Sequence, residues 1–345
     1  MRIATLIDPH HPNAIEFATA AERIGVDSLW VPELWGYDAL TGLAHLAART
    51  ETIGLGTFVV QLGSRSPALL ATSALSLQDL SGGRFRLGIG VSGPQVMEGW
   101  HGVRFTSPIA ATRETIEIVR MVGRGDRLEH RGEVYEVPLP DGAGKALRTM
   151  ASPAQVPIYV AAMGPANLAL TGELADGWLG NAFVPESADV FLDALRMGAA
   201  RADRTLADLD LVAPVAVEIT KDAAQADAAA RRHADGYAFT IGAMGAKGRN
   251  FYNDAFARLG FGAEVGDVEN LWRAGRRDEA AAAVPLDLGR LTNLLGTADA
   301  IAERIERHRA AGITTLLAKL DGPHDTQLAT LGQLIEIAGR KVADA

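Results

Sequence analysis

The sequence predicts an α/β protein, a (β/α)8 TIM barrel, and two observations favour this fold. Short apolar segments typical of buried strands alternate with amphipathic helical patterns along most of the 345 residues. Such alternation indicates a parallel sheet covered by helices. Eight strand–helix units can be counted, which is the number that closes a barrel of this length. An open doubly wound sheet is the alternative.

The expected strands are short runs of apolar and β-branched residues. In chain order they cover residues 2–7, 27–31, 53–60, 84–89, 157–162, 177–180, 211–219 and 314–319. Helical patterns, with apolar residues three and four positions apart, separate them. They lie around 16–24, within 38–49, after Pro67, after Pro108, after Pro165, and within 186–201, 222–235 and 298–310, and a closing helix follows the last strand.

Local signals support several of these boundaries. Ser66-Pro67 and Ser107-Pro108 each place a capping hydroxyl before a proline that suits the first helical position. Two segments interrupt the alternation: 124–155, which contains a short hairpin around 129–137, and 236–296. We expect both to be insertions at loops of a single barrel domain that covers residues 1–345.

Composition and charge exclude several classes of protein. A net charge of −9 argues against nucleic acid or an anionic membrane surface as a partner. The chain has no cysteine, which rules out disulfides, thiol nucleophiles and cysteine-bound zinc. No histidine pair has metal-ligand spacing, and no apolar run reaches about 18 residues, so we expect neither a metal site nor a membrane span. Without a signal-peptide pattern, a cytoplasmic enzyme acting on a small molecule is expected.

The stretch GIGVSG at 88–93 matches the spelling of the dinucleotide-binding motif G-x-G-x-x-G. That motif belongs in the first strand–helix turn, followed by an acidic residue about 20 positions later. Here it follows the fourth expected strand, Pro94 comes directly after it, and no such acidic residue ends the next strand. The Rossmann interpretation is therefore rejected. In a barrel this loop would lie on the C-terminal face, where active sites occur.

Longer segments resemble a known family. The stretch GLGTFVVQLGSRSPALLATSALSLQDLSGGRFRLGIGVSGPQVMEGWHGVRF at 54–105 is similar to the bacterial luciferase-like superfamily, and more narrowly to actinobacterial oxidoreductases that use the deazaflavin coenzyme F420. The same resemblance extends over residues 31–50, 159–178, 242–261 and 274–285. It implies a (β/α)8 barrel with an insertion near strand seven, and a homodimer.

The resemblance implies an enzyme that moves a hydride between coenzyme F420 and a small organic substrate. The cofactor would carry the difficult chemistry, and the protein would supply orientation and a dry site. One alternative is a monooxygenase of the same superfamily that uses FMN and oxygen. Another is a protein that binds a flavin without catalysis.

A phosphate site is expected where two loops meet. Gly164-Pro165 opens a helix, and free backbone N–H groups there suit a phosphate. By resemblance, this loop and the one after the fourth strand hold the phosphate of the cofactor. The residues concerned are Gly90, Val91, Ser92 and Gly93, together with Ala162, Met163, Gly164 and Pro165.

The resemblance places the deazaflavin ring near the ends of the second and third strands. It implies an acidic residue at Glu33, a cofactor wall that includes Trp35, and a cis peptide between Phe58 and Val59, after which Gln61 could reach the ring edge. Glu33 is the expected catalytic acid or base. Many relatives have a histidine at the next position, where this chain has Leu34. The proton could instead pass through one of five other residues, among which the sequence does not choose: Asp8, His10, His11, Tyr37 and His101.

Overall fold

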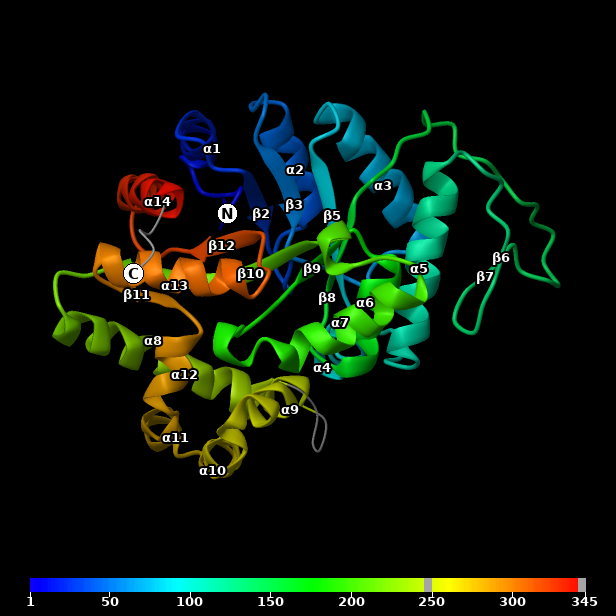
Figure 1. Cartoon of the computed structure of the whole chain (residues 1–345). Helices are drawn as coiled ribbons and strands as arrows, with labels where there is room; N and C mark the ends of the chain where they lie inside the picture. The colour runs from blue at the N-terminus through cyan, green and yellow to red at the C-terminus, as the bar shows by residue number, and fades with distance from the viewer. Residues whose placement is uncertain (245–249, 341–345) are drawn as a thin grey trace.

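The computed structural model describes residues 1–244 and 250–340, and it shows a closed barrel of eight parallel strands (Figure 1). In order around the barrel these are β1 (Arg2–Leu6), β2 (Ser28–Val31), β3 (Gly54–Thr57), β5 (Phe85–Gly90), β8 (Ile158–Ala161), β9 (Gly177–Leu179), β10 (Asp210–Ile219) and β12 (Thr315–Lys319). The barrel closes because β12 pairs with both β10 and β1. The predicted (β/α)8 fold is confirmed, and the open-sheet alternative is wrong.

One strand differs from its predicted extent. The run expected at 53–60 is regular only as far as Thr57, and β4 (Val60–Gln61) then pairs with the end of β5. The peptide between Phe58 and Val59, which separates the two pieces, is cis. The prediction of a cis bond at this position is confirmed, whereas the prediction of a continuous strand is wrong.

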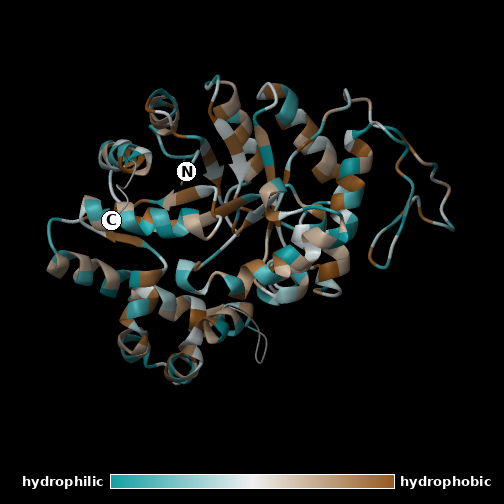
Figure 2. Ribbon diagram, in the orientation of Figure 1, coloured by the Kyte–Doolittle hydropathy of each residue, from teal (hydrophilic) through white to brown (hydrophobic). Residues whose placement is uncertain are grey.

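The helices lie outside the barrel and shield its strands (Figure 1), and Figure 2 shows that the helices carry both hydrophobic and hydrophilic residues. They are α1 (Ala14–Arg23), α2 (Ala39–Ala47), α3 (Pro67–Leu80), α4 (Pro94–Met97), α5 (Pro108–Gly123), α6 (Pro165–Leu174), α7 (Asp189–Arg201), α8 (Ala223–Ala243), α13 (Ala298–Ala310) and α14 (His324–Gly339). The predicted starts at Pro67, Pro108 and Pro165 are confirmed. No helix in the described ranges is long and apolar enough to cross a bilayer.

The two expected serine caps have different outcomes. Ser66 caps α3, because its hydroxyl accepts a hydrogen bond from the Leu69 N–H (3.2 Å). Ser107 does not cap α5: its backbone is left-handed (φ 45°), and its hydroxyl donates to the Glu133 carboxylate instead. A residue in that conformation cannot turn its side chain back to the first helical N–H groups in the usual way.

The two ends of the barrel differ in character. Side chains fill the interior, including those of Trp30, Tyr159 and Leu317, so it is a packed core and not a pore. At the N-terminal end, the Tyr159 hydroxyl donates to Asp210 (2.9 Å), and Arg86 pairs with Asp27 (2.7 Å) on neighbouring elements. An ion pair and a hydrogen bond thus link side chains at the N-terminal end, and the C-terminal end is where barrels of this fold carry their sites.

Residues 124–155 form an arm that projects from the body beside α5 (Figure 1). Its hairpin consists of β6 (His130–Arg131) and β7 (Glu136–Val137), an antiparallel pair that confirms the short hairpin expected around 129–137. The buried carboxylate of Glu114 on α5 accepts from the N–H groups of Glu133 and Tyr135, both at 2.7 Å. Glu114 and the Ser107–Glu133 hydrogen bond together hold the hairpin against α5.

The segment 236–296 shows no strand–helix alternation in the sequence, and the structure explains why. After the last turns of α8, its described residues form α9 (Phe251–Phe256), a π-helical turn (Ala257–Phe261), α10 (Gly262–Arg273), α11 (Arg277–Ala283), α12 (Leu286–Leu291) and a short strand, β11 (Leu294–Gly296). These helices share a small core of their own with α8. Because they pack mainly on one another, their pattern lacks intervening buried strands. Helix α8 also runs to Ala243, beyond its predicted end at 235.

Candidate active site

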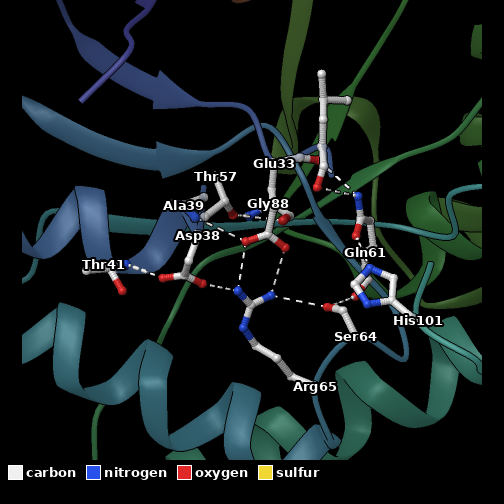
Figure 3. Close-up of polar contacts among 11 residues, drawn as sticks. Glu33, Asp38, Ala39, Thr41, Thr57, Gln61, Ser64, Arg65, Gly88 and His101 are labelled. Carbon is white, nitrogen blue, oxygen red and sulfur yellow. Dashed lines mark hydrogen bonds and ion pairs between the residues drawn. The ribbon is translucent and has the colours of Figure 1, made fainter. Parts of the chain in front are cut away.

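Several predicted residues meet where β2, β3 and β4 end (Figure 3). Glu33 follows β2, the Phe58–Val59 peptide follows β3, and Gln61 ends β4. The side chains of Glu33 and Gln61 are buried, at 8% and 6% exposure. The C-terminal ends of neighbouring barrel strands meet at one mouth, which is why residues far apart in the chain converge here.

Glu33 is held by an ion pair that the sequence did not predict. Arg65 donates Nη1 to Glu33 Oε1 (2.8 Å) and Nη2 to Oε2 (2.7 Å), and the Ala39 N–H at the start of α2 also donates to Oε2 (3.1 Å). Arg65 contacts Asp38 as well, which caps α2 by accepting from the Thr41 N–H. Both oxygens of Glu33 thus accept hydrogen bonds, and its charge is paired with that of Arg65.

The charges in this cluster reinforce one another. Hydrogen bonds to Glu33 raise the pKa of the Arg65 guanidinium. Burial works against the charged form of Asp38, yet hydrogen bonds from Thr41 and the nearby Arg65 hold the pKa of its carboxyl below the usual value. Loss of one partner from such a half-buried network leaves an uncompensated charge and is costly.

Gln61 links this cluster to His101. The Gln61 amide donates from Nε2 to the carbonyl of Glu33 (3.1 Å), and its Oε1 lies 2.8 Å from His101 Nε2. An amide oxygen only accepts hydrogen bonds, so Nε2 of His101 carries the proton. In the neutral ring, Nδ1 is then a proton acceptor, and it has no hydrogen-bond partner within the described residues. Of the five alternative proton carriers, His101 is the one joined to this cluster.

The remaining candidates lie at the rim. Trp35 and Tyr37 are exposed, as is Leu34, which replaces the histidine of many relatives. Tyr37 stacks on His10, with ring centroids 3.9 Å apart. His11 contacts His324 at the start of α14 (4.1 Å between centroids), and Asp8 accepts from the His10 N–H. None of these groups contacts the Glu33–Arg65 pair.

The glycines of the GIGVSG stretch serve packing more than loop formation. A Cβ built on Gly88 would lie 1.9 Å from the Thr57 carbonyl oxygen. The Thr57 hydroxyl also donates to the Gly88 carbonyl and accepts from its N–H, each at 2.8 Å. A Cβ on Gly90 would lie 2.6 Å from the Val59 side chain. Both glycines therefore belong to β5, and they allow it to pass closely beside the cis peptide.

This geometry predicts different outcomes for two glycines of the same stretch. Gly88→Ala should destabilise the fold by about 3 kcal/mol or more, because a backbone carbonyl cannot move away as a flexible side chain would. Gly93→Ala should unfold like the wild type, since its Cβ would meet only the Gln95 amide oxygen at 3.5 Å. Urea unfolding of the two variants measures the difference. Equal stability would show that Gly88 is a loop residue without a packing role.

The expected phosphate loops leave the barrel side by side. Gly90 at the end of β5 pairs in register with Ala161 at the end of β8, so residues 91–93 and 162–164 start at neighbouring positions. Gly164 is the N-cap of α6, and no side chain caps this helix. A Cβ on Gly164 would meet nothing within 4 Å. The first turn of α6 thus faces open space at the mouth of the barrel.

Some hydrogen-bonding groups near the start of α6 have partners in the protein, and others have none among the described residues. The carbonyl of Ala162 accepts from Trp178 Nε1 (2.9 Å), which leaves N–H groups as the free backbone groups of the turn. Asn167, in the first turn of α6, is 7% exposed, and its Oδ1 has no partner among the described residues. On the β5 side, Ser92 has a left-handed backbone (φ 59°). An anionic ligand would satisfy the free N–H groups of this turn, whereas Asn167 Oδ1, an acceptor, would need a hydrogen-bond donor.

Arg258 reaches this place from the insertion. Its Nη2 donates to the Met163 carbonyl (2.7 Å) and its Nη1 to the Val190 carbonyl (3.3 Å). Burial lowers the pKa of its guanidinium, and no carboxylate in the described part of the chain forms an ion pair with it. Its guanidinium also lies over the Phe191 ring (5.9 Å to the centroid), and only the charge of nearby Asp254 offsets its own, so it can still attract an anion. The sequence held no signal for Arg258, which lies in the segment without alternation. Arg65, in contrast, lies in a part of the sequence whose structure was predicted, because it directly precedes Ser66, the cap of α3.

A hollow of about 490 Å³ separates the loop after β5 from the insertion. Its lining residues include Pro94, Phe105, Ser107, Phe251 and Asp254. Asp254 lies four residues before Arg258, so the hollow borders the part of the insertion that carries Arg258. No group of three or more metal-ligating side chains occurs within residues 1–244 and 250–340.

Comparison with known proteins gives a consistent result. A family model described as luciferase-like monooxygenase matches residues 4–315. A Mycobacterium tuberculosis protein with the provisional name coenzyme F420-dependent oxidoreductase is 41% identical over 314 residues, which are 88% of this chain and 90% of that protein. The 5,10-methylenetetrahydromethanopterin reductase of Archaeoglobus fulgidus is 29% identical, with 88% and 87% covered. The solved F420-dependent tetrahydromethanopterin reductase of Methanopyrus kandleri superposes with a TM-score of 0.75 at 22% identity, covering 96% and 97%.

Proposed function

The chain belongs to the luciferase-like monooxygenase family, and from this premise we propose that it is an oxidoreductase that exchanges a hydride between coenzyme F420 and a small organic substrate. The observation that carries the choice of cofactor is the 41% identity, over nearly the whole length, to a protein with that provisional name. When bound, the deazaflavin supplies a carbon that accepts or donates the hydride.

The residues at the mouth fit the phosphate of such a cofactor. The uncapped start of α6 offers N–H groups, the position of Gly164 leaves room beside them, and Arg258 adds a positive charge without a carboxylate partner. Helix N-termini favour anions for these reasons. We assign the phosphate to the two loops named above, namely Gly90, Val91, Ser92 and Gly93 with Ala162, Met163, Gly164 and Pro165.

The ring is assigned to the cluster between β2 and β4. Glu33, Trp35, Phe58, Val59 and Gln61 would contact it. The Glu33–Arg65 pair would hold a fixed arrangement of charge beside the ring, and Gln61 would keep His101 in its Nε2-protonated form. Glu33 or Nδ1 of His101 would hold the proton of the substrate. The second has the simpler geometry, because Nδ1 of His101 has no partner within the described residues and Glu33 is paired with Arg65.

Titration with coenzyme F420 and with FMN, followed by absorbance and fluorescence, tests the proposal. We expect F420 to bind at micromolar concentration or below and FMN to bind at least ten-fold more weakly. A ten-fold difference in affinity corresponds to about 1.4 kcal/mol of binding free energy. Reduced F420 should then be oxidised by some member of a panel of carbonyl, imine and activated alkene compounds.

Other results of the same titration would replace the proposal. The family description as a monooxygenase favours FMN as the second candidate. Tight FMN binding and oxygen-dependent turnover would support that activity. Binding of F420 without turnover of any compound would indicate a carrier of the cofactor.

The homodimer implied by the resemblance stays a prediction. Exposed Leu69 and Leu80 on α3 are apolar side chains that such an interface could cover.

A further inference from the structure

Lys319 is a charged residue at the mouth of the barrel that none of the functions above uses. It is the last residue of β12 and one of only five lysines in the chain, at positions 145, 221, 247, 319 and 341. Its side chain is partly buried. Within the described residues it has neither a hydrogen-bond acceptor nor an ion-pair partner for its ammonium group.

Strand geometry places this side chain inside the barrel. Side chains two positions apart in a strand share one face, and Leu317, two residues before Lys319, packs in the interior core with Trp30. The register of β12 with its neighbours brings Ala216 beside Lys319, and places Leu6 next to it because Thr5 pairs with Ala318. The stem of Lys319 therefore rises through an apolar layer toward the mouth.

The charge of Lys319 is poorly compensated. Burial lowers the pKa of its ammonium group, and the nearby Asp321 opposes this only in part. The acidic residues of the ring cluster cannot supply a partner, since Glu33 and Asp38 already bind Arg65. A partly desolvated cation without a counter-ion gains most from an anionic ligand that enters its site.

The position of Lys319 shows that an anion bound to it would not be the cofactor phosphate. The phosphate is assigned beside β8, and two strands, β9 and β10, lie between β8 and β12. The ring is assigned to the cluster that begins after β2, and on that side only β1 lies between β2 and β12. Lys319 thus lies closer in strand order to the ring cluster than to the phosphate loops, on a part of the mouth from which a substrate can reach the ring.

We propose that Lys319 determines the substrate class: its ammonium group binds a carboxylate, or an equivalent oxyanion, of the molecule that exchanges the hydride. The proposal rests on the proposed function for the reaction itself. Binding of an anion by Lys319 does not depend on the proposed function, because the protein without cofactor should already bind the anion.

The test compares two probes of equal shape, benzoate and its neutral amide benzamide, on the cofactor-free protein by ligand-observed NMR. Wild type should bind benzoate at least about ten-fold more tightly than benzamide, the factor expected for one charge-assisted hydrogen bond. Lys319→Met, of similar length and apolar, should lose this preference. Lys319→Arg should keep much of it, and Lys221→Met, at an exposed lysine, should keep all of it.

Two results would overturn the proposal. One is an unchanged preference for benzoate in Lys319→Met, provided that circular dichroism shows the variant to be folded. The other is a ten-fold or greater loss of affinity of Lys319→Met for reduced coenzyme F420, which would assign the ammonium group to the ring. Because the benzoate comparison needs no cofactor, it decides about Lys319 even if wild type fails to bind F420 and the proposed function is refuted.

Discussion

Gly164→Leu should weaken the binding of coenzyme F420 by about 10²-fold while the barrel stays folded. The leucine side chain would occupy the space in front of the first turn of α6, where the phosphate is assigned. Loss of one or two hydrogen bonds to a charged group costs about 1.5–3 kcal/mol each, which corresponds to this factor. The backbone at Gly164 (φ −77°) accepts any residue, and its Cβ would meet nothing within 4 Å.

Fluorescence titration of F420 measures the affinity, and thermal unfolding checks the fold. Gly236→Leu is the matched control, because Gly236 lies exposed on α8 and its Cβ would also meet open space. Wild-type affinity in Gly164→Leu would remove this loop from the cofactor site. Arg258→Met should weaken F420 binding in the same direction, since it removes the positive charge that contacts the Met163 carbonyl beside the site.

Glu33→Gln should lower the rate of hydride transfer by about 10²-fold or more, the range in which acid–base groups contribute. The substitution keeps the size and the hydrogen-bonding reach of the side chain but removes its charge. It also leaves Arg65 with Asp38 as its remaining carboxylate. The affinity for F420 should change far less than the rate, because the phosphate site lies elsewhere. Stopped-flow absorbance of the deazaflavin measures the rate.

Asp38→Asn separates the two roles of Glu33. It removes the other carboxylate that contacts Arg65 but leaves Glu33 charged. A large fall in rate only for Glu33→Gln, with an altered pH profile, would support proton transfer by Glu33. Equal falls in both variants would show that the position of Arg65 matters. A normal rate in Glu33→Gln would reduce Glu33 to a structural residue and leave His101, whose Nδ1 has no partner among the described residues, to hold the proton.

The repeating local pattern of the sequence determined the barrel. Strand runs and helix starts depend on residues within a few positions of one another, so all eight barrel strands and the starts at Pro67, Pro108 and Pro165 could be predicted. The cis peptide at Phe58–Val59 came from family resemblance, since no local pattern marks it. The cap at Ser107 was predicted wrongly, because its hydroxyl is drawn to Glu133, 26 residues away.

The partners of the site residues were decided only by the tertiary structure. Glu33 was identified at the end of its strand, but its bidentate contact with Arg65 spans 32 residues, and the contact of Arg258 with the Met163 carbonyl spans 95. Lys319 lay within a correctly predicted strand, yet its lack of a counter-ion follows from what surrounds it in space. Charges interact through space, and closing the barrel decides which of them meet. The sequence therefore determined which elements end at the mouth, and only the folded structure decided which charges there are neutralised and which remain for a ligand.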